Sequence, residues 1–330
     1  PHPKATLPLA ITVAIAREVL VENGLPADLV CLAAEDPDGR LAGTLAVRPE
    51  VRLVDFTGST AFGDWLEANA RQARVYTEKA GVNFVVIDST DDFAGMCRNL
   101  AFSLALYSGQ MCTTPQNLLV PRGGIATDEG PKSFDEVSRG IADAVDALLA
   151  DPARAVELTG AIVNDGVRER LERAGALGKP VLHSRVIEHP SFPDAVVRSP
   201  AIVALDAAEG ADEAEFASEC FGPVSFVVAT ADTAHSLEVF RRTAGARGAL
   251  SAGVYATDRG VLDAATAAAL DVGVALSCNL TGGVFVNQTA AFSDFHATGA
   301  NPAANATYCD GAFVADRFRL IEVREPAAAG

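Results

Sequence analysis

The chain has 330 residues, of which 49% are hydrophobic and only 6% aromatic, and its formal net charge is −17. A chain of this length can bury a large core and is expected to fold as two domains or as a discontinuous pair. No run of Lys or Arg supplies the basic patch that a nucleic-acid or anionic-membrane surface needs, so both kinds of partner are excluded.

The six cysteines are scattered along the chain without paired spacing, at positions 31, 97, 112, 220, 278 and 309. A disulfide framework is therefore not expected, and no CxxC pair or Cys/His cluster suggests a metal site. No apolar run reaches the length of a membrane span, and the N-terminus does not have the pattern of a signal peptide. These features favour the reducing cytoplasm.

Apolar periodicity predicts helices and strands in alternation. Helices are expected at residues 7–21, 61–71, 91–107 and 133–149, the last with a capping-box pattern of Ser133 and Glu136. Strands are expected at residues 29–33, 51–56, near 75, and at 84–87, 117–120, 202–205, 224–228, 250–255, 274–277 and 284–286. The Gly- and Asn-rich stretch at 299–311 is expected to be a surface loop. Alternation at 319–324 predicts a half-exposed strand that pairs with another subunit.

This alternation predicts an α/β fold with doubly wound, mostly parallel sheets. Two such units are expected, one before about Glu78 and one after it. In the first unit, the strand at 51–56 runs into a Gly-containing turn and then into a helix. Backbone N–H groups and the helix dipole face an anion in this arrangement, so the turn is a candidate phosphate site.

Cys112 and Glu78 are a candidate nucleophile and base. A thiol attacks a carbonyl carbon as the thiolate, and a carboxylate can activate the water that releases the resulting thioester. Taken alone, a Cys is more often a small core residue and a Glu a solvated charge. The pair therefore needs support from the rest of the chain.

Four short motifs supply that support, in this order: Phe-Thr-Gly-Ser at 56–59, Glu-Lys-Ala-Gly at 78–81, Gly-Gln-Met-Cys at 109–112 and Glu-Cys-Phe-Gly-Pro-Val at 219–224. In this order they resemble the aldehyde dehydrogenase superfamily, and the resemblance runs over essentially the whole chain. It implies part of a Rossmann-like cofactor domain at 1–77, a catalytic thiol domain at 78–290, and a C-terminal loop with an oligomerisation strand at 291–330.

The resemblance also implies residue roles. Cys112 matches the family's nucleophile and Glu78 its general base. In the Phe-Thr-Gly-Ser turn, Gly58 and Ser59 match the contact with the cofactor pyrophosphate. Glu219 matches the carboxylate that binds the nicotinamide ribose, and Phe221 matches the aromatic residue beside the nicotinamide. On their own, Ser59 is equally explained as a helix N-cap and Phe221 as ordinary core.

The chain departs from the family pattern in two places. The Gly-Gly-Lys that usually follows the base is Ala-Gly-Val here, at 80–82. The chain opens on Pro-His-Pro-Lys, as though cut after the Lys of a Lys-Pro pair, so that Lys and the oxyanion Asn are expected upstream of residue 1. Pro3 stands where many relatives place a Glu beside the ribose 2′-hydroxyl, which favours NADP and leaves NAD open. Four histidines, His183, His189, His235 and His296, show no Cys or carboxylate partner and are given no role.

Residues 1–5, 107–117 and 286–289 resemble the ring-cleavage aldehyde dehydrogenases of bacterial phenylacetate degradation. This resemblance implies a CoA-linked substrate, 3-oxo-5,6-dehydrosuberyl-CoA semialdehyde, oxidised to the acid by a homo-oligomer. Two alternatives stay open. One is a CoA-acylating aldehyde dehydrogenase, although such enzymes usually lack the base that Glu78 provides. The other is a non-catalytic fragment that keeps the fold.

Overall fold

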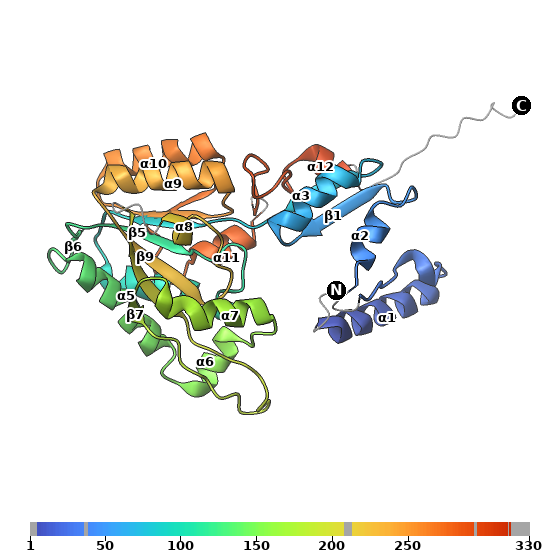
Figure 1. Cartoon of the computed structure of the whole chain (residues 1–330), viewed down its shortest axis with the longest axis horizontal. Coiled ribbons are helices and arrows are strands. Elements are labelled where there is room, and N and C mark those ends of the chain that lie inside the picture. Colours follow the sequence, from blue (N-terminus) through green and yellow to red (C-terminus); the bar gives the residue numbers. More distant parts are fainter. Residues whose placement is uncertain (1–4, 36–38, 208–212, 294–295, 316, 318–330) are drawn as a thin grey trace, which may run out of the picture.

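A computed structural model describes residues 5–35, 39–207, 213–293, 296–315 and 317. The chain forms a larger body around one sheet and a smaller N-terminal part beside it (Figure 1). None of the helices in these ranges is long and apolar enough to cross a membrane. The strand predicted at 319–324 and the Pro-His-Pro-Lys start lie outside the described residues.

The larger body is built on a seven-stranded sheet in the order β11-β10-β3-β5-β9-β8-β7. Neighbouring strands are parallel except β7 and β8, which are antiparallel. The strands are β3 (Phe84–Ile87), β5 (Asn117–Pro121), β7 (Lys179–Leu182), β8 (Ala201–Asp206), β9 (Val224–Thr230), β10 (Ala252–Tyr255) and β11 (Leu276–Cys278). A short parallel pair, β4 (Ser89–Thr90) and β6 (Ala126–Thr127), lies outside this sheet. The predicted α/β class with a mostly parallel sheet is confirmed.

Both faces of this sheet are covered by helices, which explains why its strands are apolar throughout. Phe84 and Val86 pack into one buried cluster, while Val85 and Ile87 pack into the other. The first face carries α7 (Asp165–Arg173), α9 (Thr233–Arg247) and α10 (Arg259–Val272). The second carries α4 (Phe93–Ala105), α5 (Phe134–Leu148) and α6 (Pro152–Thr159). Ser133 and Glu136 form the predicted capping box at the start of α5.

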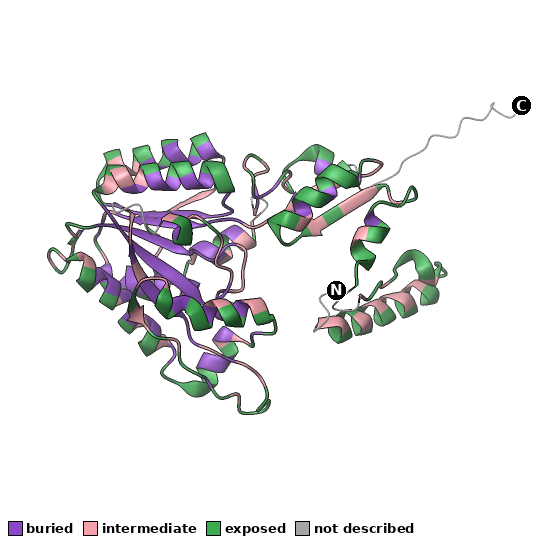
Figure 2. Ribbon diagram, viewed as in Figure 1, coloured by how far each residue is buried: buried purple, intermediate pink, exposed green. Residues whose placement is uncertain are grey.

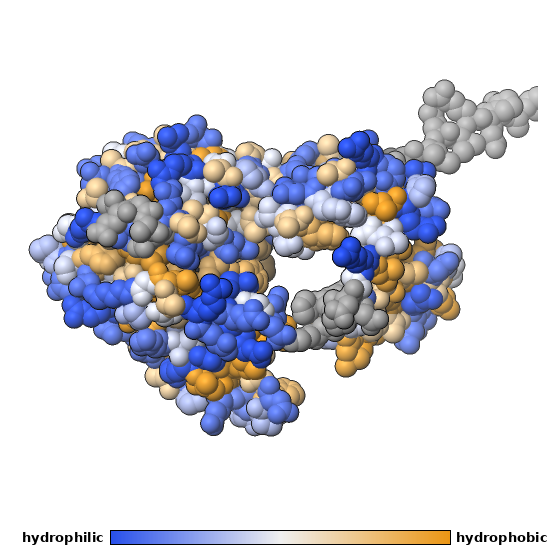
Figure 3. All heavy atoms as spheres, in the orientation of Figure 1, coloured by the Kyte–Doolittle hydropathy of each residue, from blue (hydrophilic) through white to orange (hydrophobic). Residues whose placement is uncertain are grey.

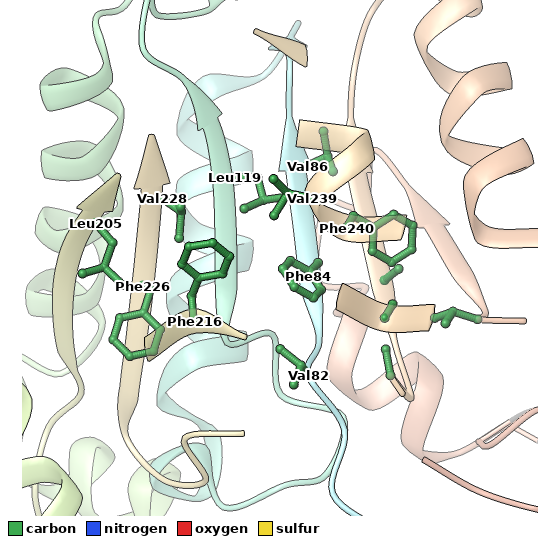
Figure 4. Packing of buried hydrophobic residues seen from close by; sticks show 14 of the residues in the cluster. Val82, Phe84, Val86, Leu119, Leu205, Phe216, Phe226, Val228, Val239 and Phe240 are labelled. Atoms are coloured by element: carbon green, nitrogen blue, oxygen red, sulfur yellow. The ribbon is translucent and has the colours of Figure 1, made fainter. Parts of the chain in front are cut away.

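Aromatic side chains fill the first face. Figure 4 shows Phe84, Phe226 and Phe216 on neighbouring elements of this cluster, with Phe240 of α9 beside them. The rings of Phe84 and Phe240 meet edge to face, with centroids 5.8 Å apart. All four of these rings are at most 2% exposed. This core fixes the strand ends from which the candidate site residues project.

The N-terminal part is much less buried (Figure 2). It contains α1 (Thr6–Glu22), a 3-10 helix (Ala27–Leu29), α2 (Leu41–Ala46), β1 (Leu53–Thr57), α3 (Thr60–Asn69) and β2 (Arg74–Glu78), with β1 parallel to β2. Helix α1 contains no buried residue, and apolar side chains such as Leu7, Ile11 and Ile15 are exposed along it. Hydrophobic surface is visible over this part in Figure 3.

Two predicted strands are wrong. Residues 29–33 are not a strand: Leu29 ends the 3-10 helix, and the Val30 carbonyl accepts from the Arg17 side chain of α1 instead of from a strand. Residues 284–286 lead into the helix α11 (Val286–Ala291). Tertiary contacts override the local β propensity there, because Phe285 stacks on Phe102 of α4 and the Asn287 side chain donates to the Ser103 carbonyl.

The surface loop predicted at 299–311 is wrong in its middle. Ala303 is fully buried and Ala304 is 6% exposed. Ala304 forms an antiparallel bridge with Glu78, and the N–H of Lys79 donates to the Ala303 carbonyl. This segment therefore lies against the end of β2 and forms part of the surroundings of the candidate site.

Candidate active site

The candidate site lies where the carboxyl ends of β1 and β2 face the amino ends of β5 and β9. Ser59 follows β1 and Glu78 is the last residue of β2, whereas Cys112 precedes β5 and Glu219 precedes β9. A cavity of about 620 Å³ opens between these edges. It is lined by all six residues predicted from sequence: Gly58, Ser59, Glu78, Cys112, Glu219 and Phe221. The structure therefore brings the predicted set together.

Asn83, just before β3, holds the loop that carries Cys112. Its side-chain amide donates to the carbonyls of Cys112 (2.7 Å) and Thr114 (2.9 Å). Its side-chain oxygen accepts from the N–H groups of Leu250 (2.9 Å) and Ser251 (3.0 Å). A carboxamide offers two donor hydrogens and two lone pairs, and all four are used here. The position of the thiol is therefore tied to two strand ends of the larger sheet.

A strained turn precedes the loop. Tyr107 and Ser108 both have φ in the left-handed region, at 52° and 55°. Such residues persist only where the surroundings hold them, and they cluster at functional sites. Ser108 is fully buried, and its hydroxyl donates to the Thr159 carbonyl at 2.9 Å. Gly109 follows at φ 63°, and a Cβ there would lie 2.4 Å from the carbonyl oxygen of Gly222. Only glycine fits at this contact.

The first residues of β5 hold the segment that carries Glu219 and Phe221. The Gln116 side chain accepts from the N–H of Cys220 (2.6 Å) and donates to the Ser218 carbonyl (2.9 Å). From the other side, the Arg170 guanidinium donates to the Phe221 carbonyl at 3.1 and 2.9 Å. The nucleophile loop and the predicted nicotinamide-binding segment are therefore fastened to each other.

Glu219 is a partly buried carboxylate in the cavity wall. Burial raises its pKa, and this effect outweighs the N–H of Gly81 and the charge of Arg170, both of which lower it. A buried carboxylate with unused acceptor capacity is well suited to accept hydrogen bonds from sugar hydroxyls. Its environment fits the predicted ribose contact.

Ser59 is the N-cap of α3, since its hydroxyl accepts from the N–H of Phe62 at 3.4 Å. Its neighbour Gly58 donates to the Glu78 carbonyl at 3.0 Å and so completes the pairing of β1 with β2. The capping role explains Ser59 without a ligand. The same geometry directs the amino end of a ten-residue helix toward the cavity, where its dipole favours an anion.

His296 is the site residue that the sequence did not reveal. Its Nε2 lies 3.4 Å from the Cys112 sulfur and 3.0 Å from Glu78 Oε1. The expectation that His296 has no Cys or carboxylate partner is therefore wrong. Its partners lie 184 and 218 positions away, so no local spacing links them. One sequence feature could have pointed to this segment. The Gly and Asn residues just after His296 are typical of a surface loop, but they are equally typical of a backbone held in place by side-chain hydrogen bonds.

Two asparagines anchor the segment that carries His296. The Asn305 side chain accepts from the N–H of Thr77 (2.9 Å) and donates to the Val75 carbonyl (3.0 Å), so it docks on β2. The Asn301 side chain donates to the carbonyls of Ala249 (3.0 Å) and Gly273 (2.9 Å) in the larger body. The segment thus bridges the two parts of the chain beside the site.

The three reactive groups share one electrostatic environment. Hydrogen bonds that the imidazolium donates to Cys112 and Glu78 raise the pKa of His296 to about 10, against the opposing effect of burial. For Glu78, burial raises the pKa, but the hydrogen bond and charge of His296 outweigh it and the pKa is lowered. The side chains of His296 and Glu78 are 16% and 20% exposed. The arrangement therefore favours an imidazolium beside a carboxylate.

Among the described residues, one cluster of His, Cys and acidic side chains is close enough for a metal ion, and it is this same set. Thiol chemistry needs a free sulfur. The same geometry is compatible with covalent and proton-transfer chemistry at Cys112.

The fold and site agree with the comparison to known families. The model of the aldehyde dehydrogenase family matches residues 2–305. This chain therefore belongs to the aldehyde dehydrogenase family.

Individual relatives give the scale of the similarity. Salicylaldehyde dehydrogenase from Pseudomonas sp. (strain C18) is 23% identical over 328 residues, which cover 94% of this chain and 60% of that protein. N-succinylglutamate 5-semialdehyde dehydrogenase from Burkholderia mallei (strain SAVP1) is 28% identical over 249 residues, with 74% and 48% covered. The NAD-dependent aldehyde dehydrogenase from Burkholderia multivorans, a crystal structure, is 60% identical with a TM-score of 0.91, and the match covers 97% of this chain and 57% of that one. This chain thus spans about half to three fifths of their lengths.

Replacing Asn83 by Ala tests how the Cys112 loop is held. Four backbone groups lose their partner, and each such group costs about 1–3 kcal/mol when buried. We expect the free energy of unfolding to fall by about 3 kcal/mol or more, and alkylation of Cys112 by iodoacetamide to change in rate. Urea denaturation and mass spectrometry measure these effects. The matched control is Asn69→Ala, which removes one exposed contact to the Trp65 carbonyl; equal stability of the two variants would contradict the role of Asn83.

Proposed function

We propose that the complete protein is a NAD(P)-dependent aldehyde dehydrogenase that oxidises an aldehyde to a carboxylate through a thiohemiacetal and a thioester on Cys112. The observation that carries this proposal is the single cavity lined by the thiol of Cys112, the carboxylate of Glu78 and the predicted cofactor residues. Membership of the family supports the reaction type.

The residues that would hold the dinucleotide suit its parts. The amino end of α3 at Ser59 would face the pyrophosphate, Glu219 would accept from the nicotinamide ribose, and Phe221 would shield the nicotinamide from water. When bound, the dinucleotide supplies the oxidant that accepts a hydride. The Burkholderia multivorans relative is described as NAD-dependent, which supports NAD, whereas Pro3 supports NADP. Comparing kcat/KM for the two cofactors decides between them.

The chain's own residues then have the following roles. The Cys112 thiolate attacks the aldehyde carbon, and the carbonyl electron pair moves to oxygen. The N–H of Cys112 is a candidate donor to that oxyanion. After oxidation, Glu78 takes a proton from water, which attacks the thioester and releases the acid. The carboxylate of Glu78 lies within 4.8 Å of the Cys112 sulfur, so a base is available to activate water beside the thioester. This supports hydrolysis of the acyl group over its transfer to CoA.

For the substrate, we propose a CoA-linked semialdehyde, 3-oxo-5,6-dehydrosuberyl-CoA semialdehyde of aerobic phenylacetate degradation. The support is the sequence at 107–117 and 286–289. In the structure, these two stretches touch, because the Thr113 hydroxyl donates to the Asn287 carbonyl at 2.8 Å and Asn287 is fully buried. The relatives named for salicylaldehyde and for a succinylglutamate semialdehyde act on other aldehydes.

Substrate competition tests this proposal. The full-length protein is assayed with the CoA thioester of a medium-chain semialdehyde, with the same semialdehyde as the free acid, and with salicylaldehyde. We expect kcat/KM to be at least about tenfold higher for the CoA thioester. Contacts with the CoA group need to contribute only about 1.4 kcal/mol of binding free energy for a tenfold difference. Equal values for thioester and free acid would reject the CoA-linked substrate but leave the aldehyde dehydrogenase proposal intact.

Replacing Cys112 by Ala should abolish aldehyde oxidation, because Cys112 is the one thiol among the residues that line the cavity. Reduced cofactor is followed by its absorbance, and folding by circular dichroism. The matched control is Cys278→Ala, which changes an exposed cysteine on β11 and should leave the rate within about twofold. Full turnover by the Cys112 variant would refute the nucleophile. No turnover by the unmodified full-length protein would favour the non-catalytic alternative.

Replacing Glu78 by Gln should slow release of the acid more than formation of the thioester. General bases contribute about 10²–10⁴-fold to rate, so steady-state turnover is expected to fall by about that factor. A burst of reduced cofactor should remain, and mass spectrometry of quenched samples should find acyl-enzyme on Cys112. Normal clearance of that acyl-enzyme would mean that another base acts. Stimulation of the wild-type protein by CoA, with an acyl-CoA product, would favour the CoA-acylating alternative.

A further inference from the structure

His296 makes a contact that the reaction proposed above does not use. A single ring nitrogen, Nε2, approaches both the sulfur of Cys112 and the carboxylate of Glu78. All three atoms lie within 4.8 Å of one another. The histidine therefore touches the atom that would form the thioester and the atom that would activate water.

The other ring nitrogen, Nδ1, does not hold the His296 ring in place through a hydrogen bond of its own. His296 Nδ1 is buried and has no hydrogen-bond partner in the structure. Buried polar atoms are usually paired, and a histidine kept for packing normally has its Nδ1 hydrogen-bonded. Within the described part of the chain, the hydrogen bonds of this ring are made by Nε2, and its partners are the candidate nucleophile and the candidate base.

A smaller cavity of about 70 Å³ is lined by His296 and shares Thr57 and Glu78 with the cavity that holds Ser59 and Glu219. Its wall includes Glu78 and His296, and its other titratable groups are Asp55, Tyr76 and Tyr308. This cavity borders His296 but none of the predicted cofactor residues Ser59, Glu219 and Phe221. Among the described residues, the titratable groups that contact His296 or share this cavity with it are Cys112, Glu78 and the three groups of this wall.

We propose that His296 is a third catalytic residue, which stabilises the Cys112 thiolate as an imidazolium and relays the proton that Glu78 takes from water. This proposal rests on the proposed aldehyde oxidation and assigns a role to a residue outside the set expected from sequence. It needs no metal ion and no further co-reactant.

The protons balance over one cycle. In the resting state, sulfur is a thiolate, His296 carries a proton on Nε2, and Glu78 is ionised. Attack forms the S–C bond and removes the negative charge from sulfur. His296 has then lost one of its two anionic partners and releases its proton to solvent through the smaller cavity.

During hydrolysis, Glu78 takes a proton from water while the hydroxyl oxygen bonds to the acyl carbon. The C–S bond breaks, and its electron pair stays on sulfur. The proton on Glu78 then passes to Nε2 over the observed 3.0 Å contact. This restores the imidazolium beside the thiolate, and the acid product loses its own proton to solvent. Water has been split once, and the three side chains are back in their starting states.

The pH dependence of alkylation of Cys112 tests the first half of this proposal without aldehyde or cofactor. Iodoacetamide reacts with the thiolate, and mass spectrometry reads the modification at Cys112. In the unmodified chain, the rate should be substantial at pH 6 and nearly flat to pH 8. In His296→Gln, which keeps an N–H near the Nε2 position but no charge, we expect the rate at pH 6 to fall at least about tenfold and to recover by pH 9.5.

A role in structure alone would lower the rate equally at all pH values or leave it unchanged. The matched control is His235→Asn, since His235 is a partly exposed residue of α9 whose Nδ1 accepts from the N–H of Ala231. It should keep the wild-type profile. If His296→Gln also keeps it, the imidazolium does not support the thiolate and the proposal is overturned.

A second measurement reads the ring of His296 itself. Proton NMR of the histidine rings should find one ring that stays protonated at pH 8 in the unmodified chain and titrates at lower pH after Cys112→Ala. Assignment uses His296→Asn. If His296 titrates identically with and without Cys112, the proposal fails. Neither outcome depends on which aldehyde is the substrate, so failure here leaves the proposed oxidation standing with Glu78 as sole base.

Discussion

The side chain of Asn83 is the contact on which the site depends most. With two donors and two acceptors satisfied, it fixes the Cys112 carbonyl against the chain ahead of β10. Buried amides of this kind are costly to leave unpaired, so the loop has one arrangement that meets all four contacts. The strained turn at Tyr107 and Ser108 is held on the same side by a buried hydroxyl. The thiol is therefore placed by contacts to the backbone of its loop, and its side chain packs against the small cluster of Leu250, Ala297, Ala303 and Ala304.

A second constraint comes from how the two sheets meet. The amino edge of the seven-stranded sheet supplies Cys112 and Glu219, while the carboxyl edge of β1 and β2 supplies Ser59 and Glu78. A site between the edges of two sheets requires contacts that keep the two sheets in a fixed relative position. Asn301 and Asn305 do this, because one binds the larger body and the other binds β2. The chain that joins the edges is also the chain that brings His296 to the thiol.

Local pattern predicted most strands of the larger sheet, and the resemblance of four motifs to the aldehyde dehydrogenase superfamily predicted the six residues that line the cavity. The strands of that sheet are short apolar runs buried on both faces, and the motifs around Ser59, Glu78, Cys112 and Glu219 lie within a few residues of a strand end. His296 could not be found this way, because its partners come from distant segments. Likewise, the run before Val286 has strand-like residues, but α4 packs on it and a helix forms. Where contacts between distant segments determine the local structure, the local sequence pattern does not predict it.

The contact between His296 and Glu78 limits when Glu78 can act as a base. A carboxylate paired with an imidazolium is a poor base, and the pKa of Glu78 is indeed lowered by that pairing although burial, the largest effect, acts to raise it. Glu78 can take a proton from water only when the histidine is neutral. In the mechanism that we propose, formation of the thioester provides that condition, because it removes the hydrogen bond to Cys112 that helps to raise the pKa of His296. In that mechanism Glu78 is a weak base while Cys112 is free and a stronger base once Cys112 is acylated, which orders the two half-reactions.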